Sequence, residues 1–177
     1  FPIVIDEAMK VTSYGALLKV CKDLLHEKIP IVDMLTIIEA VADIAEFTKA
    51  PEILLEHVRA KLYRLITQKF KDNDNILHII TIKPELEQQF IGKLQEHHGV
   101  SQLMLSIAEI NNLVTKTKKL LEDIEIKGFS KVCMVVDPVL RKRISEIYEK
   151  FGLQVSVLSH AELDSKANFA IEGTLEF

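Results

Sequence analysis

The sequence predicts an α+β (mixed α/β) fold, with an N-terminal helical subdomain over residues 1–72 and a small α/β subdomain over residues 73–177. Before residue 71, apolar residues recur with the period of an α-helix. The polar run KDNDN at residues 71–75 then marks a boundary. After it, short β-branched runs alternate with helical segments, which is typical of strand–helix units in a short parallel or mixed sheet.

Three helices are expected in the first part, where residues 1–12 are too short to assign. Ser13 can cap a helix that runs to about Glu27, and Pro30 then forces the chain into extended geometry. Asp33 offers a side-chain oxygen to cap a second helix. A third helix begins at Pro51, since proline is favoured in a first helical turn, and extends to about residue 70.

The second part contains two strand–helix units. In each, a buried strand is followed by a proline at the start of a helix, and a right-handed crossover joins the units in one sheet. Asp137 is expected to cap the second of these helices. The expected elements are a strand at 76–82, a helix from 84 that closes on His97, His98 and Gly99, a short strand at 101–105, a helix at 106–127, a strand at 132–136, a helix at 138–151 and a strand at 153–158.

No catalytic or cofactor site is expected. The Walker and dinucleotide-binding motifs are absent from the sequence, and the junctions at Lys83 and Asp137 lack the glycine that a phosphate site needs. His97 and His98 are adjacent and would point about 100° apart on a helix, so they do not share a metal ion. The spacing of Ser159 and Glu162 is that of a capping box, not of a catalytic pair. We therefore expect no enzyme, no cofactor and no metal.

Charge and composition exclude other classes. A net charge of −4 and a pI near 5.9 argue against a nucleic-acid partner, which would require a basic surface. Cys21 and Cys133 lie in apolar surroundings and are expected to be reduced core thiols. No apolar run approaches the about 20 residues that cross a bilayer. Because the sequence begins without methionine, we expect it to come from a longer parent protein.

Two segments are candidates for protein interfaces. The connection between the first two helices carries Ile29, Pro30, Ile31, Val32 and Asp33, where connections are usually polar. Its apolar residues either pack onto the helices or face a partner. The second candidate is the basic run that contains Arg141, Lys142 and Arg143, which forms either a solvated helix face or a contact with an acidic partner.

Four segments resemble a known family. They are LLHEKIPIVDMLTIIEA at 24–40, VRAKLYRLI at 58–66, IKPELE at 82–87 and VLSHAEL at 157–163. Together they resemble the cytoplasmic domain of the FlhA/InvA/MxiA (FHIPEP) family, the export-gate proteins of flagellar and virulence type III secretion systems. This chain has Val32 where the family commonly has arginine, which removes a cation from the connection.

The resemblance implies that the chain is the C-terminal pair of subdomains of an export-gate protein. It implies a homo-oligomeric ring, typically a nonamer, that docks export chaperones with their cargo and works with the export ATPase complex. It also implies a place at the cytoplasmic face of the bacterial inner membrane, with the membrane helices in the upstream part of the parent. The flagellar branch is favoured; a virulence-type homologue and a soluble helical adaptor are the alternatives. The interface residues expected are Ile29, Pro30, Ile31, Val32, Asp33, Arg141 and Arg143.

Overall fold

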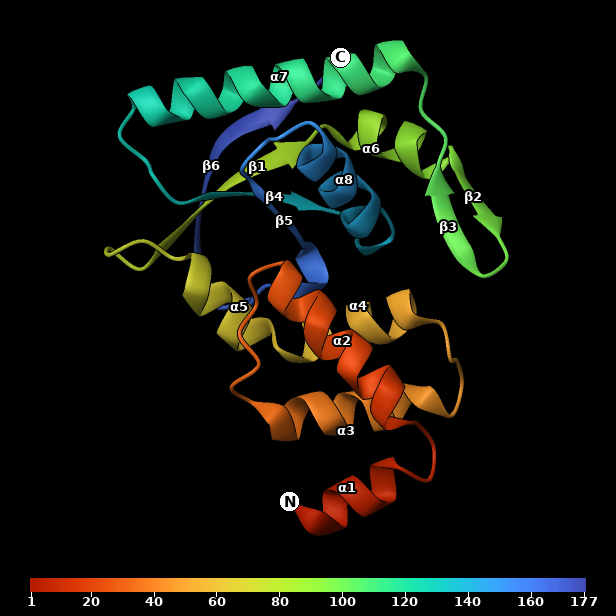
Figure 1. Cartoon of the computed structure of the whole chain (residues 1–177). Coiled ribbons are helices and arrows are strands. Elements are labelled where there is room, and N and C mark those ends of the chain that lie inside the picture. Colours follow the sequence, from red (N-terminus) through yellow and green to blue (C-terminus); the bar gives the residue numbers. More distant parts are fainter. The chain divides into compact units, whose positions relative to one another are not determined.

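A computed structural model describes residues 1–177, which divide into two compact units, Phe1–Ile66 and Thr67–Phe177 (Figure 1). The division falls inside helix α5 (Tyr63–Phe70). Our sequence-based boundary after residue 72 lies just past the end of that helix and stays a prediction. None of the helices combines the length and the apolar composition that crossing a bilayer requires.

The first unit is helical, as predicted. Ser13 accepts a hydrogen bond from the backbone N–H of Ala16, and Asp33 accepts one from that of Thr36, so both predicted caps are confirmed. The short N-terminal segment that the sequence left unassigned is also a helix. The helices of this unit are α1 (Pro2–Ala8), α2 (Tyr14–His26), α3 (Met34–Ala45) and α4 (Pro51–Lys61), followed by the first turn of α5.

The third predicted helix is broken in two, so the continuous helix to residue 70 is wrong. α4 ends at Lys61, and the N–H of Leu62 donates to the carbonyls of both Val58 and Arg59. This tighter turn redirects the chain while Leu62 stays buried. No proline or glycine marks the break, so the apolar spacing did not reveal it.

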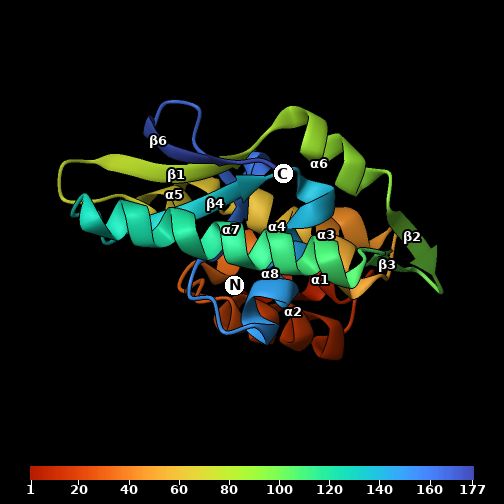
Figure 2. The ribbon, with the colours of Figure 1, turned by 90° about the horizontal axis from the view of Figure 1, so that it is seen from above.

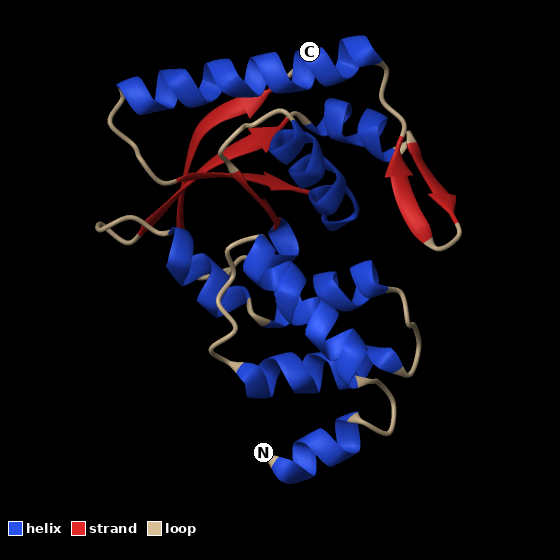
Figure 3. Cartoon of the chain, viewed as in Figure 1, coloured by secondary structure: helices blue, strands red, loops and turns tan.

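The second unit contains a four-stranded sheet in the order β5-β4-β1-β6, and every neighbouring pair is parallel. The predicted strands at 76–82 and 132–136 match β1 (Ile76–Ile82) and β4 (Val132–Val136). β5 (Ser156–Ser159) is shorter than predicted, and the edge strand β6 (Asn168–Leu175) was missed. Figure 3 distinguishes these strands from α6 (Pro84–Ile91), α7 (Ile107–Ile126) and α8 (Pro138–Lys150).

A two-stranded antiparallel hairpin follows α6; its first strand lies where we predicted more helix, whereas its second strand lies close to the short strand predicted at 101–105. The strands are β2 (Leu94–His97) and β3 (Val100–Leu103). His98 and Gly99 connect them with positive φ angles of 53° and 78°, as a type I′ hairpin turn requires. The expectation that His97 and His98 close a helix is therefore wrong, because the dipeptide His98-Gly99 reverses the chain instead.

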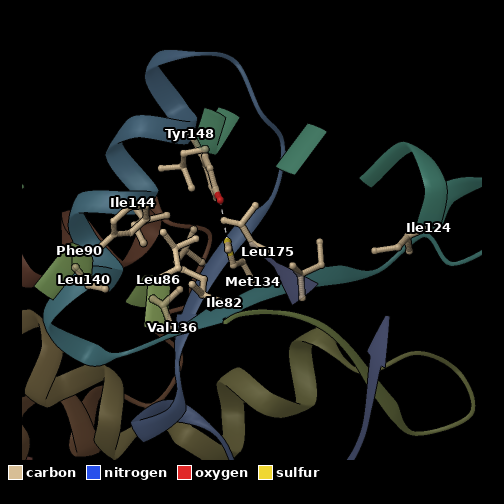
Figure 4. Close-up of a cluster of buried hydrophobic side chains, with 13 residues drawn as sticks. Ile82, Leu86, Phe90, Ile124, Met134, Val136, Leu140, Ile144, Tyr148 and Leu175 are labelled. Carbon is tan, nitrogen blue, oxygen red and sulfur yellow. Dashed lines mark hydrogen bonds between the residues drawn. The ribbon is translucent and has the colours of Figure 1, made fainter. Parts of the chain in front are cut away.

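The core of the second unit lies between the sheet and its helices, and Figure 2 shows α7 and α8 side by side there. Tyr148 is buried in this core, with its hydroxyl 2.8 Å from Thr117 Oγ1 and 2.8 Å from the sulfur of Met134 (Figure 4). Burial raises the pKa of Tyr148, so its hydroxyl stays protonated. A satisfied polar group therefore fixes α8 against α7 and β4.

Candidate functional site

The connection between α2 and α3 has a defined local geometry at its start. Lys28 adopts a positive φ of 64°, its N–H donates to the carbonyl of Leu25, and the N–H of Ile29 donates to the carbonyl of Leu24. This pair of bonds is a Schellman motif, which usually brings the second residue past the cap onto the last helical turn. Accordingly, Ile29 and Leu24 are both fully buried.

The remaining residues of the connection progress outward. Pro30 and Ile31 are half-buried, whereas the side chain of Val32 is 80% exposed. The two interpretations of this connection therefore apply to different residues. Ile29 packs onto the helical unit and is not available to a partner at the surface, while Val32 places an aliphatic side chain in solvent.

Asp33 has a local structural role. Its carboxylate accepts hydrogen bonds from the backbone N–H of Thr36 at 3.1 Å and from the hydroxyl of Thr36 at 2.7 Å. These bonds satisfy donors at the start of α3 that would otherwise lack partners. Asp33 is exposed, so it fixes the end of the connection without being removed from the surface.

A buried ion pair supports the start of the connection. Arg59 on α4 places Nη1 3.7 Å from Oε2 of Glu27, the residue that caps α2, and both side chains are almost fully buried. Sequence reasoning missed this pair, although both residues belong to the segments that resemble the family. The pair joins the end of α2 to α4 and thus restricts where the connection can lie.

Exposed apolar residues extend from this connection along α2. Tyr14, Leu18 and Leu25 are 69%, 55% and 53% exposed, and their spacing places them within about 40° of one helix face. We call Tyr14, Leu18 and Leu25 the α2 stripe. From apolar spacing alone, Leu18 and Leu25 would be assigned to the buried side of the helix. The apolar face is in fact wider than the core can cover, so part of it faces solvent.

The basic run on α8 does not form the surface patch that we expected. Arg141 is fully buried, with Nε 3.4 Å from Oε1 of the buried Glu162 and Nη1 3.5 Å from the carbonyl of Val157. The expectation of a solvated or partner-facing Arg141 is therefore wrong, because a carboxylate in the interior attracts it. Arg143 is half-buried and pairs with Glu146 at 3.4 Å.

The predicted capping box at Ser159 is also wrong. Ser159 is buried and makes no side-chain cap bond to the short 3-10 helix η1 (His160–Glu162), and Glu162 turns inward to Arg141. The prediction for Asp137 is confirmed, since its carboxylate accepts a hydrogen bond from the N–H of Val139. Across residues 1–177, no group of three or more His, Cys, Asp or Glu side chains is arranged to hold a metal ion.

Comparison with known proteins identifies similar sequences over almost the whole chain. A model of the FHIPEP family matches residues 1–168. The flagellar biosynthesis protein FlhA of Helicobacter pylori (strain J99) is 40% identical over 176 residues, which cover 99% of this chain and 24% of that protein. The chain therefore spans about a quarter of the length of this curated relative.

Solved structures share the fold. The nonameric SctV-C from EPEC superposes with a TM-score of 0.87 at 19% identity, covering 98% of this chain and 52% of that one. CdsV of Chlamydia pneumoniae, in its complex with CdsO, gives a TM-score of 0.83 at 21% identity, covering 99% of this chain and 52% of that one.

Proposed function

This chain belongs to the FHIPEP family, and we propose that it forms part of the cytoplasmic platform of a flagellar type III protein export gate. In this role the platform docks export chaperones with their cargo and orders the export of substrates. The match to a flagellar FlhA, at 40% identity over 99% of this chain, supports the flagellar branch. The platform would lie at the inner membrane, held there by the upstream part of the parent protein.

The observation that carries this proposal is the apolar surface on the helical unit. The α2 stripe and Val32 expose large aliphatic or aromatic side chains, and burying such residues against a partner is favourable at about 25 cal/mol per Å². A second copy of the chain is the partner we propose, in a closed ring of nine subunits. The description of SctV-C as nonameric supports this choice.

The residues that we predicted at the interface contribute in different ways under this proposal. Pro30, Ile31 and Val32 supply contact surface, while Ile29 and Asp33 fix the shape of the connection from inside and from its end. Arg143 is accessible to a limited extent on α8 and would lie at the rim of a contact. Arg141 would act only by holding α8 to η1.

The proposed action of this chain is binding without covalent chemistry. Chaperones carrying cargo and components of the export ATPase complex would bind the assembled ring and be ordered by it. The complex of CdsV with CdsO supports the idea that this fold binds a second, different protein. Docking would then depend on which surfaces remain accessible after ring assembly.

Surface substitutions in the full-length parent, in its own flagellated cell, test this proposal. Leu18→Asp combined with Val32→Asp places two charges on the apolar surface and is expected to abolish crosslinks between copies and secretion of flagellar proteins into the medium. Ile126→Asp is the matched control, because Ile126 is 85% exposed on α7. It is expected to leave both readouts unchanged. Normal crosslinking and secretion in the double variant would contradict the proposed interface.

Alkaline extraction of membranes from the same cells tests the location. We expect the parent protein to remain in the membrane pellet. Release into the supernatant would contradict a membrane-held export gate and would favour the soluble adaptor instead. Pull-down of export chaperones by the complete cytoplasmic domain then tests the docking role separately.

A further inference from the structure

His78 lies between two carboxylates in the second unit. Its Nε2 is 2.6 Å from Oδ2 of Asp72, and its Nδ1 is 2.7 Å from Oε1 of Glu172. The imidazole is only 4% exposed, and its ring stacks on Phe129 with the ring centroids 4.2 Å apart. Packing therefore fixes the imidazole in the plane that presents both of its nitrogens to acidic oxygens.

This geometry favours a proton on each ring nitrogen. A neutral imidazole has one N–H donor and one bare acceptor nitrogen, whereas an imidazolium has two donors. A carboxylate oxygen beside a bare nitrogen would bring two acceptors together at hydrogen-bond distance. The positions of Asp72 and Glu172 thus match the imidazolium, which makes a charge-assisted hydrogen bond on each side.

The three residues join three separate segments of the second unit. Asp72 belongs to the turn between α5 and β1, and its Oδ1 also accepts the N–H groups of Asp74 and Ile76. His78 is in β1. Glu172 is the extra residue of a bulge in β6, because Ile79 pairs with Ile171 whereas Ile80 pairs with Gly173.

β6 is the edge strand of the sheet, so it has a strand neighbour on one side only. Its exposed Phe169 and Ile171 contribute less to the core than the buried residues of β1 do. A bulge also interrupts the regular backbone ladder at this point. The bond between Glu172 and His78 therefore stabilises the part of β6 where the backbone pairing is weakest.

We propose that Asp72, His78 and Glu172 form a proton-dependent clamp, in which the imidazolium joins the α5–β1 turn to the bulge of β6 and loss of its proton loosens that edge strand. The proton leaves to solvent, and no other bond is broken. One ring nitrogen then carries a lone pair that faces a carboxylate oxygen. The two must separate or admit water, and we expect this movement at the bulge, where the backbone ladder is interrupted.

Other titratable groups lie on the segments packed around the clamp. They are Lys71 and Asp74 on the α5–β1 turn, Lys131 and Cys133 before and within β4, and Glu125 and Lys127 at the end of α7, which packs on β6. The ammonium of Lys131 is held 3.2 Å from the carbonyl of Lys71, and the thiol of Cys133 donates to the carbonyl of His78. The proton on the imidazole therefore lies closest to the charges of Asp72 and Glu172.

Electrostatics set the pH range in which the clamp is closed. Burial alone would lower the pKa of His78, but the hydrogen bonds and charges of Glu172 and Asp72 outweigh it and raise that pKa above 6.5. The clamp's stabilisation is thus fully present below pH 6.5 and is lost as pH rises through the folded pKa. The hydrogen bond from the N–H of Ile76, and then that from His78, lower the pKa of Asp72 below 3.8. The Asp72 carboxylate is therefore protonated, and the clamp loses this acceptor, only at a pH below 3.8.

Nitrogen NMR of the histidine rings in the 177-residue chain tests the protonation state directly. At neutral pH we expect His78 to show two protonated ring nitrogens. A bare ring nitrogen on His78 at neutral pH would overturn the proposal. His160 is a suitable internal reference because it lies in the same unit, 63% exposed, with one carboxylate 3.8 Å away.

Hydrogen exchange of the β6 amides tests the loosening. At about pH 6, His78→Gln should exchange about tenfold faster than the wild type in β6, equivalent to about 1.4 kcal/mol. The ratio of the two exchange rates, variant over wild type, should fall towards one as the pH rises above the folded pKa of His78, because the wild type then also loses its clamp. His160→Gln should match the wild type throughout. Glu172→Gln, which keeps the shape of the side chain, should reproduce His78→Gln. A ratio that does not change with pH would overturn the proton-dependent clamp and leave a purely structural contact.

Discussion

Glu27 and Arg59 meet as an ion pair in the interior of the helical unit, with Oε2 of Glu27 3.7 Å from Nη1 of Arg59. Each belongs to a different segment that carries the family resemblance, one at the end of α2 and the other in α4. The pair explains physically why both residue types occur there. It joins the start of the exposed connection to a helix that is distant in sequence, so the candidate interface depends on a buried contact.

Breaking this pair should destabilise the helical unit strongly. Arg59→Met leaves the carboxylate of Glu27 buried without its cation, and the expected loss in the free energy of unfolding is about 3–5 kcal/mol. Urea denaturation measures it. Glu27→Met combined with Arg59→Met should recover much of the loss. Lys19→Met removes the exposed pair with Asp23 and should cost at most about 1 kcal/mol. An equal cost for Arg59→Met and Lys19→Met would contradict this account.

Substitutions at Asp33 separate its capping role from a role in binding. Asp33→Ala should lower the free energy of unfolding by about 1 kcal/mol, because the N–H of Thr36 loses its acceptor. Asp33→Asn retains an acceptor oxygen and should keep most of that stability. Thermal and urea denaturation give the stability, and crosslinking of the full-length protein gives the assembly. If Asp33→Asn is stable yet fails to assemble, Asp33 contacts the partner directly.

The N-terminus of α7 should weaken in acid. Glu109 bonds to Lys93 and accepts the N–H of Ser106 at 2.8 Å, and these contacts lower the pKa of Glu109 from 4.5 to about 2. A depressed folded pKa stabilises the native state above pH 4.5, and this contribution is lost as pH falls through about 2. Exchange of the first-turn amides of α7 should therefore accelerate over that range. Glu109→Gln should flatten the dependence, whereas Glu85→Gln, on α6, should not.

The two cysteine thiols should differ in reactivity. Both are free and buried, as the sequence predicted. Burial raises the pKa of Cys133 to about 12, and it raises the pKa of Cys21 as well, although Cys21 retains 9% exposure. Because the thiolate is the reactive form, Cys21→Ala should react with a disulfide reagent more slowly than Cys133→Ala. Faster reaction of Cys133 would show that the sheet opens more readily than the helical unit.

Local patterns were sufficient for much of the secondary structure. Ser13, Asp33 and Asp137 each accept a hydrogen bond from a backbone N–H two or three residues ahead, and each begins a helix where the sequence placed it. The two β-branched runs became the central strands β1 and β4, whose residues are mostly buried. These elements could be predicted because their residues interact within one turn or have a continuous apolar run.

The hairpin and the edge strand required more than local pattern. His98 and Gly99 adopt positive φ, but nothing in their neighbourhood separated that turn from a helix end, which also favours glycine. β6 contains Asn168, Glu172 and Gly173 and exposes part of its apolar residues, so it lacks the signature of a buried strand. It forms because β1 offers a free edge with which it can pair.

The sequence by itself determined the family resemblance, the two-part α+β organisation, the helix caps and the central strands. Only the tertiary structure decided that Ile29 and Arg141 are buried, that Val32 and the α2 stripe are exposed, and that His78 lies between two carboxylates. The physical reason is the separation along the sequence over which each interaction acts. Backbone capping and apolar periodicity act between residues a few positions apart, whereas the burial of a charged side chain depends on a partner that folding brings from a distant segment.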